Sequence, residues 1–204
     1  MNTSTPPSST LVRKPETVLK QVFGYSEFRD GQKAVIDAAI NGQDSLVLLP
    51  TGGGKSVWYQ IPALVLEGVT IVISPLISLM QDQVTQLQAL GVKAAYVNNS
   101  LAREEQQLVY QQLHQGQIKL LYVAPEKVLQ HEFLERLSHL NVSLFAIDEA
   151  HCVSHWGHDF RPHYFRLNEL KQRFAHVPMM ALTATADKAT RFDIVEQLKL
   201  QQPY

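Results

Sequence analysis

Residues 46–56 read Leu46-Val47-Leu48-Leu49-Pro50-Thr51-Gly52-Gly53-Gly54-Lys55-Ser56. The apolar start predicts a buried strand, and the Lys-Ser pair predicts a helix that begins near Lys55. Three consecutive glycines let the loop between them fold tightly, so that successive N–H groups turn toward one anion. The N-terminus of the helix adds about half a positive charge at the same place. This stretch therefore predicts a phosphate-binding loop between a strand and a helix.

The loop contains the residue types that hold a nucleoside triphosphate with its metal ion. We expect Lys55 to reach the β- and γ-phosphates and the hydroxyl of Ser56 to ligate Mg²⁺. The remaining candidates for phosphate binding are Thr51, Gly52, Gly53 and Gly54. The strict G-x-x-x-x-G-K-[ST] pattern would place glycine where this chain has Leu49, although T-G-G-G-K-S remains. A flexible glycine turn, or a helix C-cap followed by a new helix, is the alternative interpretation.

Composition excludes several other classes of protein. The 204 residues carry 18 Lys and Arg against 19 Asp and Glu, which gives a net charge of −1. No apolar run exceeds five residues, whereas a membrane-spanning helix takes about 18 or more. The single cysteine, Cys152, excludes an intramolecular disulfide framework and a cysteine-only zinc site, and it favours a reducing, intracellular setting. A charge so close to zero also argues mildly against nucleic acid, because such binders are often strongly basic.

The chain divides into a short tail and one medium domain. Residues 1–14 form the predicted disordered tail, since the first ten are rich in Ser, Thr and Pro and lack apolar periodicity. Residues 15–204 alternate between strand-like and helix-like segments. The expected strands are Ser45–Leu49, Thr70–Ile73, Ala94–Val97, Leu120–Val123, Leu144–Ile147 and Met179–Leu182. Because they are apolar throughout, the alternation predicts an α/β fold with a doubly wound, mostly parallel sheet that is covered on both faces.

Two of the helix-like segments show an apolar stripe. The stripe of residues 76–90 consists of Leu76, Met80, Val84 and Leu87. The stripe of residues 188–200 consists of Ala189, Phe192, Val195 and Leu198. A stripe on one side of a helix is typical of a helix that packs against a core. We therefore predict that each stripe faces the sheet.

Two adjacent carboxylates follow the expected strand at 144–147. Asp148 and Glu149 precede Ala150 and His151, and all four lie just past the strand end. Asp148 suits the acid that holds Mg²⁺ opposite a phosphate loop. Glu149 suits a general base that positions and deprotonates the attacking water. The alternative interpretation is a plain helix start, at which the helix dipole favours acidic residues.

These motifs carry a resemblance to a known family. T-G-G-G-K-S at 51–56 and D-E-A-H at 148–151 together resemble the superfamily 2 helicases. Further stretches narrow the resemblance to the RecQ family of DNA helicases. They are F-G-Y-S-E-F-R-D-G-Q at 23–32, S-P-L-I-S-L-M-Q-D-Q at 74–83, V-A-P-E at 123–126, C-V-S-H-W-G-H-D-F-R-P at 152–162 and A-L-T-A-T-A at 181–186. The resemblance implies that residues 15–204 are a RecA-like P-loop NTPase domain, the first of the two lobes of such an enzyme.

The resemblance also implies a role for residues ahead of the phosphate loop. Tyr25, Arg29 and Gln32 would form the adenine pocket, in which the Gln32 amide matches the donor and acceptor of the adenine edge. The family usually has proline where this chain has Asp30. For Phe28 we predict an ordinary core position.

The segment after the acidic pair resembles the aromatic-rich loop with which the family senses single-stranded DNA. The resemblance implies that Trp156, Phe160 and Arg161 contact DNA, since aromatic side chains stack on bases. The residues that would couple hydrolysis to motion are His151, His158, Thr183 and Thr185. N–H groups at the turns of residues 74–76 and 123–126 would hold DNA phosphates. A zinc site made of Cys152, His155, His158 and His163 is the alternative for this segment.

The implied activity is that of an ATP- and Mg²⁺-dependent 3′→5′ DNA helicase in repair and recombination. Its partners would be single-stranded and duplex DNA and a second RecA-like lobe of the same parent chain, with no membrane. It would act in the cytoplasm or nucleoid, or in a eukaryotic nucleus. The sequence ends at Tyr204 without a second lobe, so we expect this lobe alone to bind nucleotide weakly and to hydrolyse it poorly. An RNA helicase lobe, and a nucleotide-dependent binding module without turnover, are the alternatives.

Overall fold

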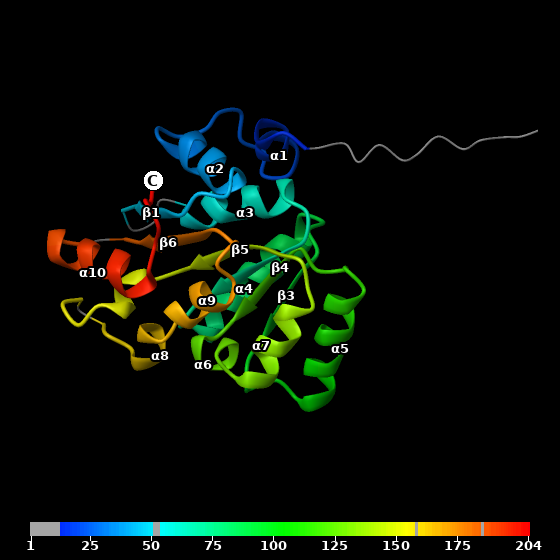
Figure 1. The fold of residues 1–204 in the computed structure, drawn as a ribbon. Coiled ribbons are helices and arrows are strands. Elements are labelled where there is room, and N and C mark those ends of the chain that lie inside the picture. Colours follow the sequence, from blue (N-terminus) through cyan, green and yellow to red (C-terminus); the bar gives the residue numbers. More distant parts are fainter. Residues whose placement is uncertain (1–12, 51–53, 158, 185) are drawn as a thin grey trace, which may run out of the picture.

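The fold is built on one sheet of six strands (Figure 1). The structure is a computed structural model, and it describes residues 13–50, 54–157, 159–184 and 186–204. The strands are β1 (Ser45–Leu48), β2 (Val69–Ile73), β3 (Ala94–Val97), β4 (Leu120–Val123), β5 (Val142–Ile147) and β6 (Met179–Thr183). They lie in the order β1-β6-β5-β2-β4-β3, and every pairing among them is parallel. The predicted α/β class is confirmed, and all six expected strands are present with ends that differ by at most two residues.

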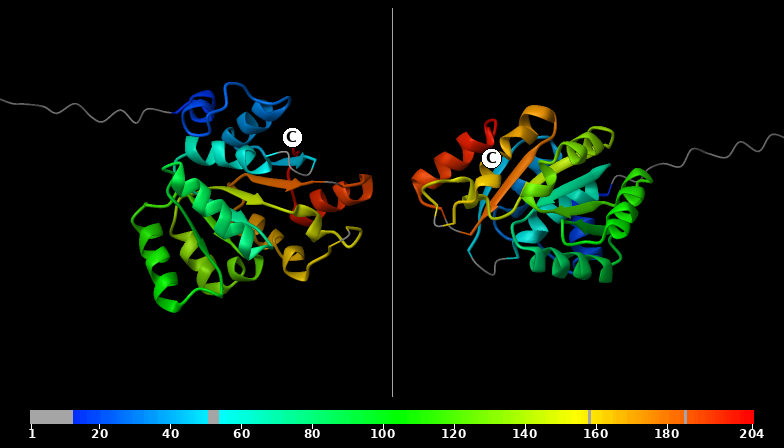
Figure 2. Two further views of the ribbon diagram at one scale, coloured as in Figure 1. Left: turned by 180° about the vertical axis from the view of Figure 1, so that it is seen from behind. Right: turned by 90° about the horizontal axis from the view of Figure 1, so that it is seen from below.

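Helices cover both faces of the sheet. They are α1 (Pro15–Gln21), α2 (Gln32–Ile40), α3 (Lys55–Val65), α4 (Ile77–Ala89), α5 (Arg103–His114), α6 (Pro125–Val128), α7 (His131–Ser138), the 3₁₀ helix η1 (Ala150–Val153), α8 (Pro162–Phe165), α9 (Asn168–Arg173) and α10 (Lys188–Leu198). Figure 2 shows the sheet between the two helical layers. Among the described residues, no helix is both long and apolar enough to cross a membrane.

Each strand divides its side chains between two cores. Ile71 and Ile73 of β2 pack with α5, α7, α9 and α10, whereas Val72 packs on the other face with α2, α3 and α4. Successive side chains of a strand point to opposite faces, so a strand covered on both sides must be apolar at every position. This requirement explains why the strands read as continuous apolar runs.

The two predicted helical stripes differ in outcome. Met80, Val84 and Leu87 are buried as expected, but Leu76 lies one residue before α4 and is 43% exposed. The stripe predicted for α10 is half right, since Leu198 is buried and Val195 packs against the core, but its first two residues are not buried. The buried positions of α10 are Thr190, Ile194 and Leu198, whereas Ala189 and Phe192 are exposed. A repeat of three drifts around a helix of 3.6 residues per turn, and a repeat of four keeps Thr190 on the buried side despite its hydroxyl.

A buried carboxylate holds the edge of the sheet where β1 and β6 begin. Asp44 Oδ1 accepts hydrogen bonds from Lys171 Nζ (2.6 Å) and from the N–H of Met179 (2.9 Å). Its Oδ2 accepts from the N–H of Gln201 (2.8 Å), and its carbonyl accepts from the N–H of Tyr204 (2.9 Å). The chain end therefore lies beside β1, as Figure 1 shows. A wide hollow of about 700 Å³ surrounds this anchor, but its buried charges already satisfy one another.

We predict that Asp44→Ala lowers the free energy of unfolding by about 3–5 kcal/mol, because it leaves the Lys171 ammonium buried without its counter-charge. Urea denaturation of the purified chain measures the change. Asp37→Ala is the matched control, since Asp37 pairs with Lys33 on the exposed side of α2 and should alter stability little. An equal loss in both variants would contradict the assignment of Asp44 as the anchor.

Candidate functional site

The candidate site lies where the carboxyl ends of β1, β6 and β5 meet. Lys55 is the first residue of α3, and its Nζ lies 3.4 Å from Glu149 Oε1. Gly54 precedes it with a φ of 64°, a left-handed conformation that glycine adopts without strain. Ser56 follows in the first turn of α3 and is half-buried. Thr51, Gly52 and Gly53 lie outside the described residues.

The turn after β5 is strained and is held on both sides. Glu149 has a φ of 52° and a ψ of 46°, a left-handed conformation that is unusual for a residue with a side chain. Its N–H donates to Asp148 Oδ1 (2.9 Å), and the Tyr164 hydroxyl donates to the Asp148 carbonyl (2.8 Å). Such strain costs on the order of 1–3 kcal/mol and clusters at functional sites. The strained turn places Asp148, the candidate Mg²⁺ ligand, directly next to Glu149, the candidate base.

The ionised form of Asp148 is disfavoured in its surroundings, and a nearby cation would stabilise it. The pKa of Asp148 is raised to about 6, because burial and then the negative charge of Glu149 favour the protonated form, while Lys55 opposes the shift. A divalent cation at this place would favour the ionised form, as a nearby positive charge does. Carboxylate and hydroxyl oxygens are the hard ligands that Mg²⁺ prefers. Asp148 and Ser56 therefore fit the metal role that their residue types predict.

His151 joins the acidic pair to the neighbouring strand. Its Nδ1 lies 2.8 Å from the hydroxyl of Thr183, the last residue of β6, and 3.4 Å from Glu149 Oε2. His151 and Thr183 are both buried. A continuous row thus runs from Lys55 through Glu149 and His151 to Thr183, which brings together four of the predicted site residues. Thr185 lies outside the described residues.

The aromatic segment is residues 154–165, and its described residues, 154–157 and 159–165, pack on η1. His155 stacks on Phe160 with ring centroids 3.9 Å apart, and Phe165 lies against both rings. Trp156 is 75% exposed beside this stack. A side chain at Gly157 would place its Cβ 2.6 Å from the carbonyl oxygen of His151, so only glycine allows this close approach. Phe160 is thus partly packed inside the segment, whereas the ring of Trp156 is exposed on the surface of the segment.

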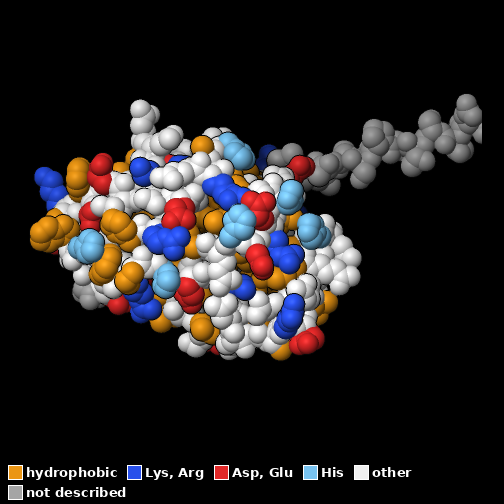
Figure 3. Space-filling model, turned by 60° about the horizontal axis from the view of Figure 1, so that its bottom comes forward, with side chains coloured by type: hydrophobic (Ala, Val, Ile, Leu, Met, Phe, Trp, Pro, Cys, Tyr) orange, Lys and Arg blue, Asp and Glu red, His pale blue; other side chains and the backbone are white. Residues whose placement is uncertain are grey.

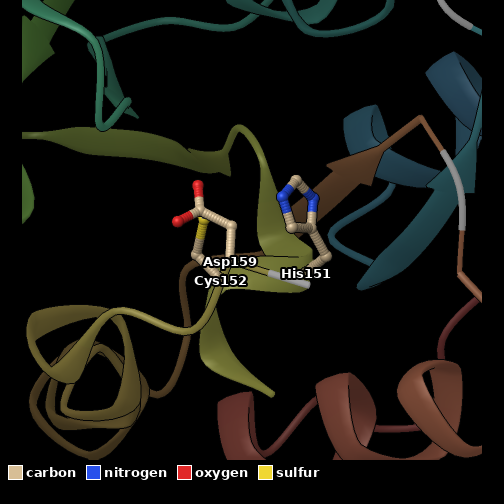
Figure 4. Close-up of side chains that lie close together, drawn as sticks. All are labelled: His151, Cys152 and Asp159. Carbon is tan, nitrogen blue, oxygen red and sulfur yellow. The ribbon is translucent and has the colours of Figure 1, made fainter. Parts of the chain in front are cut away.

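Cys152 of η1 and Asp159 of the aromatic segment are in contact, with Cys152 Sγ 3.9 Å from Asp159 Oδ2. Figure 4 shows their side chains next to each other, with the ring of His151 beside them. Ligand atoms of these three residues lie within 4.8 Å of one another, but the surroundings do not suit a metal ion. Arg161 donates from Nε (3.3 Å) and Nη2 (3.2 Å) to Asp159 Oδ2, and burial, the largest cause, raises the pKa of the Cys152 thiol to about 12.

The zinc alternative for the segment is not supported by the described residues. His155 stacks on Phe160, and within the described ranges Cys152, His155 and His163 do not gather as metal ligands. His158, which was predicted to couple hydrolysis to motion, lies outside the described residues.

The adenine-pocket candidates lie together next to the phosphate loop. Tyr25, Arg29 and Gln32 line a hollow of about 70 Å³ with Gly54 and Val57. Gln32 is buried, and its Oε1 accepts a hydrogen bond from the N–H of Arg29 (3.0 Å). That bond orients the amide, while the half-exposed Tyr25 ring is open to stacking. Phe28 packs with α1 and α2 in the core, as predicted.

Sequence reasoning missed a second group of residues at the same edge of the sheet. A hollow of about 160 Å³ beyond the ends of β3 and β4 is lined by Arg103, Lys127 and Arg136, together with Glu132 and three glutamines. The three cations come from α5, α6 and α7, so their sequence positions do not suggest a shared site. Tyr164 was also missed, because a buried tyrosine resembles any other core aromatic in sequence.

Comparison with known proteins now gives the family. The model of the DEAD/DEAH box helicase family matches residues 29–192. The chain is 60% identical to "ATP-dependent DNA helicase RecQ" of Pasteurella multocida, over 92% of this chain and 30% of that protein. It is 57% identical to the protein of the same name in Haemophilus influenzae, over 95% of this chain and 32% of that protein. The chain thus spans about a third of the length of these relatives.

Solved structures agree on the fold. The helicase MrfA, in a crystal structure with DNA and AMPPNP, matches 95% of this chain and 29% of its own chain, with a TM-score of 0.73 and 18% identity. A hypothetical ATP-dependent RNA helicase from Sulfolobus tokodaii matches 93% of this chain and 55% of its own, with a TM-score of 0.67 and 19% identity. With the family model, the RecQ relatives and the row from Lys55 to Thr183 in agreement, the chain belongs to the DEAD/DEAH box helicases.

Proposed function

We propose that this chain is the ATP-binding lobe of a RecQ-type DNA helicase, which couples ATP hydrolysis to movement along single-stranded DNA and to duplex unwinding in the 3′→5′ direction. The observation that carries the proposal is the row Lys55–Glu149–His151–Thr183, in which His151 belongs to η1, the 3₁₀ helix on which the aromatic segment packs. The phosphate-binding candidate and the DNA-binding candidate are therefore parts of one packed unit.

The nucleotide end of this row suggests how hydrolysis is gated. Lys55 is paired with Glu149, and a bound triphosphate would draw the ammonium toward its β- and γ-phosphates. Glu149 would then be free to accept a proton from the water that attacks the γ-phosphorus. Ser56 and Asp148 would hold Mg²⁺, which would supply charge stabilisation for phosphoryl transfer. Tyr25, Arg29 and Gln32 would hold the adenine. A second lobe would supply an arginine to the transition state.

The proposed DNA binding does not require a strongly basic protein. Figure 3 shows positive and negative side chains interspersed over one face of the molecule, and the net charge of the chain is −1. Contact would instead come from Trp156 stacking on a base, from Arg161, and from N–H groups at the turns before α4 and α6. The hollow with Arg103, Lys127 and Arg136 could accept phosphates farther along the same strand.

We predict that Glu149→Gln in the full-length protein lowers the ATP turnover number by about 10²–10⁴-fold, because the amide cannot accept the proton of the attacking water. Binding of a fluorescent ATP analogue should persist. Glu104→Gln, on the exposed side of α5, is the control and should hydrolyse ATP normally. Wild-type turnover by the Glu149 variant would remove it as the base.

We predict that Trp156→Ala raises the single-stranded DNA concentration needed for half-maximal stimulation of ATP hydrolysis about 5- to 150-fold. This increase corresponds to the loss of one stacked base. Phe192→Ala is the matched control, since Phe192 is also an exposed aromatic residue, on α10. The assay measures ATP hydrolysis in the full-length protein as a function of oligonucleotide concentration. Stimulation by RNA rather than DNA in the unaltered protein would favour an RNA helicase.

We predict that Mg²⁺ binding to the nucleotide-free protein depends on pH through Asp148. The pKa of this acid is raised to about 6, and Mg²⁺ needs the carboxylate. Affinity should be constant well above pH 6 and fall about tenfold per pH unit below it, since each ion then displaces one proton. Calorimetric titration measures the affinity. Asp148→Asn should abolish this dependence, and an unchanged pH profile in that variant would contradict the assignment.

A further inference from the structure

A chain of buried polar side chains lies beneath the acidic pair, on the α3 and α4 face of the sheet. The hydroxyls of Tyr59 and Tyr122 are 3.0 Å apart. Gln60 Nε2 donates to the Tyr122 hydroxyl (3.1 Å) and to Gln83 Oε1 (3.1 Å). These four residues come from α3, β4 and α4, so the chain joins three elements. None of them belongs to the site described above.

Both hydrogens of the Gln60 amide nitrogen are used in this chain. Gln60, Tyr59 and Tyr122 are almost fully buried, and Gln83 is half-buried where α4 meets α3. A buried amide that loses a partner bears its full desolvation cost, so the bonds select one relative position of the two helices. Burial raises the pKa of Tyr122 to about 12 and that of Tyr59 well above its usual value. Both hydroxyls therefore keep their protons and act as fixed hydrogen-bonding groups.

The Gln60–Gln83 bond joins α3, which begins at the proposed phosphate-binding site, to α4, which begins at a proposed DNA-contacting turn. α3 starts with Lys55 and Ser56, and Gln60 lies about one turn farther along. α4 starts after the turn at residues 74–76, where Leu76 is 43% exposed and its N–H donates to Ser74 Oγ (3.4 Å). A shift of α4 relative to α3 would therefore move this turn relative to the phosphate loop.

We propose that Gln60 and Gln83 are positioning residues, which hold the start of α4 in register with the phosphate loop so that DNA bound at residues 74–76 acts on a correctly placed nucleotide site. This inference rests on the proposed function. Neither side chain needs to touch ATP or DNA. The Gln60–Gln83 bond sets how much DNA is required to stimulate hydrolysis. Basal hydrolysis, without DNA, does not depend on this bond.

The test uses Gln83→Met and Gln83→Glu in the full-length protein. Methionine is close in size but removes the acceptor, whereas glutamate retains an acceptor oxygen for Gln60. We expect Gln83→Met to raise the single-stranded DNA concentration for half-maximal stimulation about tenfold, as one hydrogen bond is worth, with unchanged basal hydrolysis and KM for ATP. Gln83→Glu should restore at least part of the loss. Gln88→Met is the control, because it removes a hydrogen bond from α4 to the carbonyl of Ala94 (3.0 Å) and not to α3.

The outcomes separate this inference from the proposed function. If DNA does not stimulate the unaltered protein, the proposed function itself fails. If stimulation is normal in the unaltered protein and Gln83→Met needs no more DNA than wild type, only the positioning role is wrong. Equal losses in Gln83→Met and Gln88→Met would show a general disturbance of α4 and would overturn the proposal. Gln60→Met, followed by circular dichroism to confirm folding, should reproduce the Gln83→Met shift.

Discussion

The position of β6 between β1 and β5 is the constraint on which the site depends. Leu48 pairs with Thr183, and Ile147 pairs with Ala181. This register brings the phosphate-binding candidate, the Thr183 hydroxyl and the acidic pair to one line at the carboxyl edge. Residues more than 90 positions apart, such as Lys55 and Glu149, meet only because a strand from the end of the domain lies between theirs. The Asp44 anchor at the opposite edge holds β1 and β6 at their starts, so the register is stabilised from both ends.

The adjacent acids of the site favour the binding of a cation, although they lower the stability of the fold. Asp148 is half-buried beside a second carboxylate, and the loss of solvation together with that charge raises the pKa of Asp148 to about 6. Lys55 compensates only in part, since its ammonium contacts Glu149. A fold optimised for stability alone would not place two half-buried acids side by side on a strained turn. The arrangement makes sense where Mg²⁺ and a polyphosphate supply the missing charges of both signs.

Much of this could be predicted from sequence, because short-range chemistry decides it. The strand, the glycines and Lys55 identify a phosphate loop, and the uniform apolar runs identify a sheet covered on both faces. Other features depend on partners distant in sequence. Asp44 and Gln60 look like ordinary surface residues until the fold buries them. The face of α10 was misjudged because Phe192 is apolar and Thr190 is polar, while the packing of the helix puts them the other way round.

The site is connected to the DNA-binding candidates along both faces of the sheet. On one face, His151 and Cys152 of η1 lie against the core that α10 shares, and the aromatic segment closes over them. On the other face, Tyr59, Gln60 and Gln83 connect α3 to α4. Both routes start at the end of β5, since Asp148 lies close enough to raise the pKa of Tyr59 and Tyr122. Under the proposed function, a metal ion at Asp148 would therefore alter the charge next to the elements of both helical layers.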